Sequence, residues 1–185
     1  SRKFMMRKKP MLAYPVSSKP IDYTKPVFIQ PKLDGVRCVI QYEPKTIRSE
    51  FYAGKVKAYS RTGKEWKNIQ HILDELKPFF EKNPSIILDG ELYNHDLRND
   101  FEKIISCVRK TKPTDEHRAE SAKLVQFHCY DIIDETKVFD ERDLFIRLNV
   151  PRNHCIYHVE TLEIDETQAN FIHGQNLEKG YEGSI

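Results

Sequence analysis

Several features that would define a function are missing from this 185-residue sequence. No apolar run approaches the length of a bilayer span, so a membrane segment is not expected. The four cysteines show no paired spacing, which argues against a disulfide framework or metal cluster and makes a reducing cytoplasm the default compartment. The basic N-terminus is not followed by an apolar stretch, so no secretory signal is predicted. Neither Gly-x-Gly-x-x-Gly nor a Walker loop occurs, and a bound triphosphate would therefore have to be held by side chains.

A strong charge of one sign is also missing. The 30 Lys and Arg residues against 28 Asp and Glu residues give a net charge of +2, which argues against nucleic-acid binding by bulk charge. Basic residues are nevertheless concentrated in residues 1–10, which contain no acid. This terminus is either an electrostatic contact for phosphates or a frayed, solvated end.

The hydrophobic patterns predict more strands than helices. Strands are expected at residues 27–29, 36–40, 55–60, 85–93, 124–133, 155–164 and from 180 onward. Helices are expected at residues 65–80, where Pro78 ends or kinks the helix, and at residues 141–148. Two more are expected to begin at caps: one at Asn99, which runs to residue 108, and one at Asp165, which runs to about residue 178. Residues 112–123 are either helical or looped. Strands that come in runs favour one α+β domain of antiparallel sheets flanked by helices over a Rossmann arrangement.

Residues 30–37, Gln-Pro-Lys-Leu-Asp-Gly-Val-Arg, lie between two apolar runs. Asp34-Gly35 is a strong turn signal, because Gly accepts positive φ and Asp bonds its own backbone. Lys32 is therefore expected at the mouth of a strand–turn–strand unit. By position alone it is either a solvated loop charge or a nucleophile, and a neighbouring cation such as Arg37 would favour the unprotonated amine that a nucleophile needs.

Lys-x-Asp-Gly-x-Arg at residues 32–37 resembles the signature of the covalent nucleotidyltransferases, which include ATP-dependent DNA ligases, RNA ligases and mRNA capping enzymes. In that family the lysine amine attacks the α-phosphate of a nucleoside triphosphate. Three further family-like elements follow in order: Asp-Gly-Glu at 89–91, Tyr-Asp-Ile-Ile-Asp at 130–134 and Glu-Gly at 182–183. Each alone is a common turn or strand end, whereas the four in this order are difficult to obtain by chance.

The resemblance implies a role for one residue of each element. Lys32 would be the nucleophile that carries AMP. Glu91 would bond the ribose or help to hold a divalent cation, and Tyr130 would stack on the purine. Glu182, together with Glu91, would bind Mg²⁺, which favours one or two carboxylates along with phosphate oxygens and water.

Further residues are assigned by the same resemblance. Ser-Arg-Thr-Gly at 60–63 and the segment 101–110 are similar to elements of viral and phage-type DNA ligases. Arg61 would bind nucleotide phosphate and later the 5′-phosphate of a nick, because the paired donors of arginine suit a phosphate. Arg37 would contact phosphate or ribose and the nucleic acid. Gln30 lies where the family reads the purine edge, and Leu33 would also border the nucleotide.

Residues 1–185 are therefore predicted to form the ATP-grasp-like nucleotidyltransferase (adenylylation) domain of an ATP-dependent DNA ligase. ATP, Mg²⁺ and nicked duplex DNA are the expected ligands, and a monomer in the cytoplasm (of the host cell if viral) is the expected state. The family's later lysine-bearing strand and OB-fold domain are expected to be absent from this chain. Two alternatives stay open: an mRNA guanylyltransferase, which would use GTP, and a non-catalytic nucleic-acid-binding module that relies on the basic N-terminus.

Overall fold

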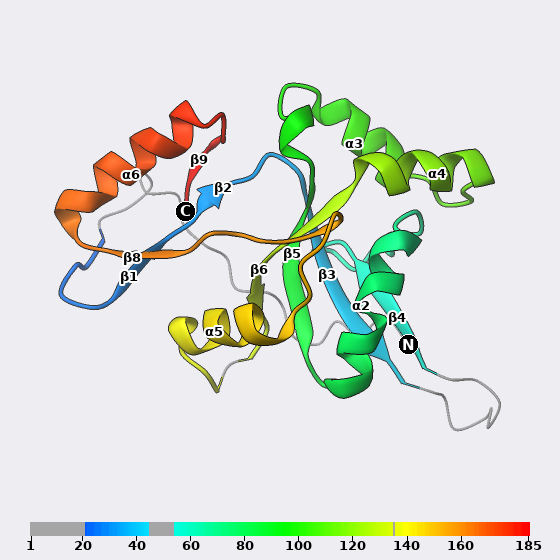
Figure 1. Ribbon diagram of the computed structural model, residues 1–185, viewed down its shortest axis with the longest axis horizontal. Helices are drawn as coiled ribbons and strands as arrows, with labels where there is room; N and C mark the ends of the chain where they lie inside the picture. The colour runs from blue at the N-terminus through cyan, green and yellow to red at the C-terminus, as the bar shows by residue number, and fades with distance from the viewer. Residues whose placement is uncertain (1–20, 45–53, 135) are drawn as a thin grey trace.

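The computed structural model describes residues 21–44, 54–134 and 136–185 (Figure 1). The strands are β1 (Val27–Ile29), β2 (Pro31–Lys32), β3 (Val36–Glu43), β4 (Lys55–Tyr59), β5 (Ile87–Tyr93), β6 (Gln126–Ile132), β7 (Ile156–His158), β8 (Leu162–Ile164) and β9 (Gly183–Ser184). The helices are α2 (Gln70–Lys82), α3 (Phe101–Val108), α4 (Asp115–Leu124), α5 (Phe139–Asn149) and α6 (Glu166–Glu178), with a 3₁₀ turn, η1 (His95–Leu97). The predicted phosphate contact at residues 1–10 lies outside the described residues.

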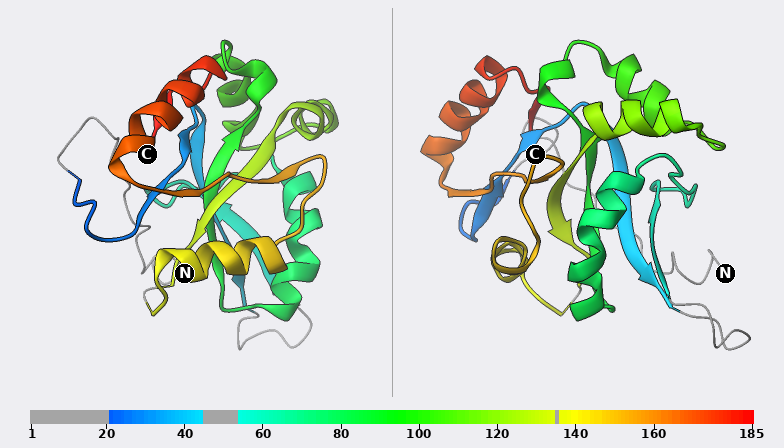
Figure 2. Two further views of the ribbon diagram at one scale, coloured as in Figure 1. Left: turned by 60° about the vertical axis from the view of Figure 1, so that its left-hand side comes forward. Right: turned by 45° about the vertical axis from the view of Figure 1, so that its right-hand side comes forward.

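A five-stranded sheet in the order β4-β3-β5-β6-β7 forms the centre of the fold. Its neighbours pair antiparallel except β6 and β7, which are parallel. Two antiparallel pairs, β1 with β8 and β2 with β9, lie to one side with α6 beyond them (Figures 1 and 2). The predicted α+β class with antiparallel-rich sheets is confirmed. None of the helices in the described ranges has the length and apolarity of a membrane span.

The apolar stripe predicted for residues 65–80 does become the buried face of a helix, α2, but its ends differ from the prediction. The helix begins at Gln70 and continues to Lys82 with Pro78 inside it, so of the two predicted effects of Pro78, an end or a kink, the end is wrong. A proline in a helix frees the carbonyl four residues earlier, here that of Asp74. Asp74 and Pro78 are exposed to water, whereas Phe79 and Phe80 are buried in the core, which favours continuation of the helix.

Two other predicted boundaries need correction. The N-cap of α3 is Asp100 rather than Asn99, and it makes no side-chain capping bond. The predicted strand at 155–164 is two strands in different sheets, because β7 joins β6 while β8 pairs with β1. The chain leaves the central sheet after Val159, whose N–H still bonds the carbonyl of Cys129 at 2.8 Å. By contrast, the cap of α6 by Asp165 is confirmed, with Gln168 completing a capping box.

Strand β9 brings the end of the chain against the lysine motif. Lys32 lies opposite Gly183 in the β2–β9 pair, and the N–H of Glu182 donates to the carbonyl of Lys32 at 3.1 Å. Gln30 and Ile185 exchange two further backbone hydrogen bonds of 3.0 and 2.8 Å. The first and last sequence elements singled out above therefore share one sheet.

Candidate active site

Lys32 lies at the edge of the small β2–β9 sheet, beside Glu182. Its Nζ is 3.7 Å from Oε1 of Glu182, and the two side chains are 39% and 46% exposed. An exposed ion pair of this kind contributes only about 0–1 kcal/mol to stability. The strand pairing, rather than the ion pair, therefore holds the amine in place.

A cavity of about 300 Å³ opens beside Lys32, between the β2–β9 pair and the central sheet. This volume lies at the lower end of the range of small-molecule sites. Most of the residues predicted from the sequence line it, namely Gln30, Lys32, Leu33, Arg37, Glu91 and Tyr130. Arg61 lies in the exposed turn after β4 and does not line this cavity. Glu182 does not line it either, but its carboxylate forms an ion pair with Lys32, which does.

Glu91 on β5 is held at the wall of the cavity by two donors. Its carboxylate accepts a hydrogen bond of 3.2 Å from the N–H of Gly35 and one of 3.5 Å from the hydroxyl of Tyr130. Burial raises the pKa of Glu91 to about 7, because a charged carboxylate loses water contact there, while the Gly35 N–H and Arg37 act in the opposite direction. Glu91 therefore titrates near neutral pH.

The turn at Asp34-Gly35 forms as predicted, but for a different reason. Among the described residues, positive φ occurs at Gly63 and Gly180, and not at Gly35. A Cβ at Gly35 would lie 2.2 Å from the carbonyl oxygen of Leu92 and 2.8 Å from Cγ of Glu91. Glycine is required here so that the bend between β2 and β3 can approach β5 closely.

Arg37 is anchored to the floor of the cavity by Asp89. Its Nε and Nη2 bond the two carboxylate oxygens of Asp89 at 3.0 and 2.5 Å, a paired arrangement, and its guanidinium lies 5.6 Å from the ring centroid of Tyr130. Burial raises the pKa of Asp89 to about 6 even though Arg37 opposes this shift. Trp66 fixes the backbone, because its indole N–H donates to the carbonyl of Arg37 at 3.1 Å.

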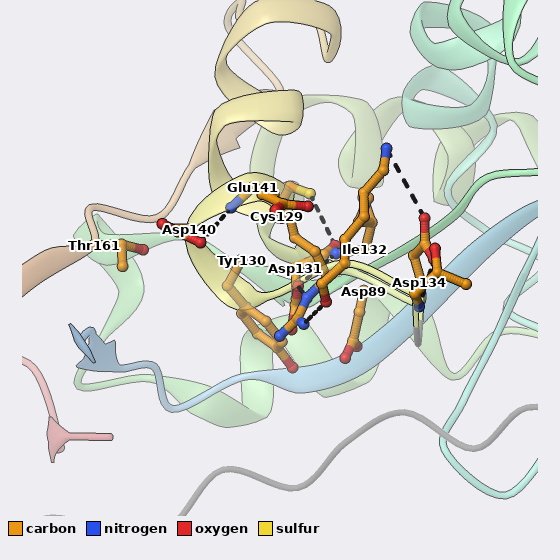
Figure 3. A network of polar contacts seen from close by, with 12 residues as sticks. Asp89, Cys129, Tyr130, Asp131, Ile132, Asp134, Asp140, Glu141 and Thr161 are labelled. Carbon is orange, nitrogen blue, oxygen red and sulfur yellow. Dashed lines mark hydrogen bonds and ion pairs between the residues drawn. The ribbon is translucent and has the colours of Figure 1, made fainter. Parts of the chain in front are cut away.

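A second arginine–aspartate pair lies next to the first. Asp131 is the register neighbour of Asp89 across β5 and β6, and the two are seen side by side in Figure 3. Arg142 from α5 bonds Asp131 at 2.8 and 3.3 Å, and its guanidinium lies 5.3 Å from the ring of Phe139. A buried carboxylate, Asp89, and a half-buried one, Asp131, thus lie side by side, and each is paired with a cation. Such pairing offsets the cost of burying charge.

Tyr130 forms the aromatic wall of the cavity. Burial raises the pKa of its hydroxyl far above the usual value, so the side chain stays neutral. Leu33 is buried in a small cluster with Tyr93 and Val159, against which Tyr130 also packs. An aromatic face bordered by apolar side chains suits a flat heterocycle.

Sequence reasoning missed six residues that line the cavity: Pro31, Asp89, Asp131, Phe139, Arg142 and Ile185. Asp89 lies two positions before Glu91 and Asp131 follows Tyr130, and an acid within an apolar strand pattern was the available signal. No local pattern distinguishes Phe139 or Arg142, because α5 reaches the cavity only through tertiary packing.

Comparison with known proteins gives two kinds of match. Residues 10–185 match the family model described as "ATP dependent DNA ligase domain". A solved structure named "Pmar-Lig_PreS3" is 21% identical, with a TM-score of 0.62, over 85% of this chain and 37% of that chain. Another, titled "DNA binding with a minimal scaffold: Structure-function analysis of Lig E DNA ligases", is 20% identical with a TM-score of 0.62 and covers 97% of this chain and 61% of that chain. No curated protein matches.

These structures are longer than the present chain, which spans between about a third and three-fifths of their lengths. At about 20% identity, the likeness establishes a shared fold. Residues 10–185, which match the family model, include the residues that line the cavity and all four sequence elements described above.

Proposed function

Because this chain belongs to the ATP-dependent DNA ligase domain family, we propose that its cavity binds ATP and that Lys32 becomes joined to AMP. The AMP then passes to the 5′-phosphate of nicked duplex DNA, and the nick is sealed by the protein to which this domain belongs. One observation carries the proposal: the β2–β9 pairing places the amine of Lys32 at a cavity that also contains Arg37, Glu91 and Tyr130. A viral or phage origin, a monomer and a cytoplasmic location remain predictions.

The cavity offers complementary groups to each part of the nucleotide. The purine would lie against the ring of Tyr130, since any base can stack on an aromatic face. The carboxylate of Glu91, when ionised, would accept hydrogen bonds from the ribose hydroxyls. Arg37, held by Asp89, would direct its positive charge toward the phosphates. Arg61, which lies outside the cavity, would contact the nick phosphate rather than the buried end of the nucleotide.

In the first step, the neutral amine of Lys32 attacks the α-phosphorus in line with the leaving oxygen. A phosphorus–nitrogen bond forms, the amine gives up a proton, and pyrophosphate leaves. In the second step, an oxygen of the 5′-phosphate attacks the same phosphorus, the phosphorus–nitrogen bond breaks, and Lys32 is regenerated. Finally the 3′-hydroxyl attacks the 5′-phosphorus and releases AMP.

The residues around Lys32 fit a Mg²⁺ ion that is bound together with a triphosphate. Within the part of the chain that the structure describes, no group of three or more His, Cys, Asp or Glu residues is arranged to hold a metal by itself. Mg²⁺ commonly takes one or two carboxylates and completes its shell with phosphate oxygens and water. Glu182 and Glu91 would supply the carboxylates, and the ion would offset the charge on the leaving pyrophosphate.

Intact-protein mass spectrometry tests the proposal. With ATP and Mg²⁺, the protein is expected to gain the mass of one AMP, and added pyrophosphate is expected to remove it. Lys32→Ala should gain nothing, whereas Lys25→Ala, an exposed lysine outside the cavity, should behave like the wild type. A mass gain that persists in Lys32→Ala would refute the assignment of the nucleophile. Labelling by GTP in place of ATP would favour the guanylyltransferase alternative.

A further inference from the structure

The side-chain amide of Gln30 is held in one orientation by two acceptors. Its Nε2 lies 3.1 Å from the carbonyl oxygen of Tyr130 and 2.8 Å from Oγ1 of Thr161. A carbonyl oxygen can only accept, so the nitrogen end of the amide must face Tyr130. Thr161 Oγ1 directs its own proton to the carbonyl of Val159 at 3.4 Å, which leaves its lone pairs for Gln30. Thr161 and Tyr130 both appear in Figure 3.

This orientation commits both amide protons of Gln30 to the protein. The backbone N–H and carbonyl of Gln30 are also paired, in both cases with Ile185. The remaining polar atom is Oε1, which can only accept, and Gln30 lines the cavity next to Tyr130. A ligand stacked on Tyr130 would therefore meet a hydrogen-bond acceptor at this point.

Thr161 itself is firmly placed. It is only 6% exposed, and its carbonyl accepts a hydrogen bond of 3.2 Å from Nη2 of Arg147. It lies in the connection between β7 and β8, far from Gln30 in the sequence, and no sequence motif identified it.

Resting on the proposed function, we propose that Thr161 is a positioning residue that sets purine choice by locking the amide of Gln30. With Oε1 presented to the base, a purine with a 6-amino donor is bound and one with a 6-oxo group is disfavoured. A 6-oxo group would place two acceptors against each other, and a site built for a donor discriminates against a ligand that lacks it.

The test compares the equilibrium binding of ATP and ITP, because inosine replaces the 6-amino group of adenosine with a 6-oxo group. Wild-type protein should prefer ATP. Thr161→Val removes the hydroxyl with little change of shape, and it should lower the ATP/ITP preference about fivefold, since one ordinary hydrogen bond is worth about this factor. Thr161→Ser should restore the preference. Thr167→Val, which removes an exposed hydroxyl bonded to Asp165, is the matched control and should keep the wild-type ratio.

A second variant shows whether Thr161 acts through Gln30. Gln30→Leu should abolish the preference, and adding Thr161→Val to it should cause no further change in the ratio. A merely structural role of Thr161 would weaken ATP and ITP equally, and that result, like an unchanged ratio in Thr161→Val, would overturn the inference.

Failure of this inference is distinguishable from failure of the proposed function. Nucleotide binding is measured apart from the AMP adduct, so wild-type protein that forms the adduct but binds ATP and ITP equally overturns only the role of Thr161. Wild-type protein that prefers ATP in binding but never gains AMP on Lys32 overturns only the chemistry. Absence of binding to either nucleotide would overturn both.

Discussion

Replacement of Glu91 by Gln should change how the stability of the protein depends on pH. Burial raises the pKa of Glu91 from 4.5 to about 7 in the folded state. Between these pH values the folded protein keeps a proton that the unfolded chain has lost, so stability falls as pH rises. The contribution is fully present below about pH 4.5 and is lost by about pH 7. At 1.36 kcal/mol for each tenfold change in the dissociation constant, the loss is about 3 kcal/mol.

Glu91→Gln removes this titration while keeping the size of the side chain and an oxygen that can accept from Gly35. The free energy of unfolding should be measured in urea for wild type and variant at several pH values from 4.5 to 8. The wild type should lose about 3 kcal/mol relative to Glu91→Gln across that range. Glu163→Gln, on exposed strand β8, controls for the loss of one carboxylate.

A flat difference between wild type and Glu91→Gln over this pH range would refute the reasoning, because it would mean that the folded protein does not hold the proton. A difference that grows in the opposite direction would mean that the Gly35 N–H and Arg37 outweigh burial. In either case Glu91 would be fully ionised at neutral pH before nucleotide binds.

The close packing and the buried charges of the site give two further predictions. Gly35→Ala should lower the free energy of unfolding by about 1–3 kcal/mol in the same urea assay, because the added Cβ would overlap the backbone of Leu92. The control is Gly174→Ala in α6, where the Cβ meets open space, and it should raise the free energy of unfolding by up to about 1 kcal/mol. Asp89→Ala should cost about 3–5 kcal/mol, because it removes the buried carboxylate that pairs with Arg37. Asp115→Ala, which breaks the exposed pair of Asp115 with Arg118, should cost less than about 1 kcal/mol. If Asp89→Ala cost no more than Asp115→Ala, the interpretation of the Arg37–Asp89 pair as a buried ion pair would be contradicted.

Local patterns in the sequence were sufficient to predict the main elements of the core. Helix α2 follows a helical period and β6 largely alternates, whereas β3 and β5 were detectable as apolar runs, because consecutive residues of both strands are buried. The same patterns could not separate β7 from β8, since a strand that changes sheets keeps its alternation. They also overestimated the effect of Pro78, because exposure of that turn is a tertiary property.

The residues of the candidate site also fall into two groups, those that a sequence motif identifies and those that only tertiary packing brings to the site. Lys32, Glu91 and Tyr130 could be found because each occupies a short motif whose order along the chain is informative. Arg142 and Thr161 could not be found, since they reach the site through packing of α5 and of the β7–β8 connection. Register shows why the motif residues meet: Arg37 lies opposite Glu91, and Glu91 lies opposite His128, two positions before Tyr130. Sequence alone gives the order of the motifs but not this alignment.

The structure also implies that the two sides of the cavity differ in stability. Asp89 and Tyr130 belong to long strands inside the five-stranded sheet, and they open only when the core opens. Lys32 belongs to a pair of two-residue strands. That pair depends on the Gln30–Ile185 bonds and on Ser184, whose hydroxyl contacts His173 and Asn176 of α6 at 2.9 and 2.8 Å.

Local opening of β9 would therefore remove Ile185 from the cavity and Glu182 from Lys32 while the floor stays folded. Backbone amides of Lys32 and Ile185 should then exchange with solvent faster than those of Gly90 and Cys129, and bound ATP should slow the first pair more than the second. Because the nucleophile lies on the less stable side and the base-stacking ring on the more stable side, nucleotide that bridges them should order the site. Equal protection of all four amides without ATP would contradict this division.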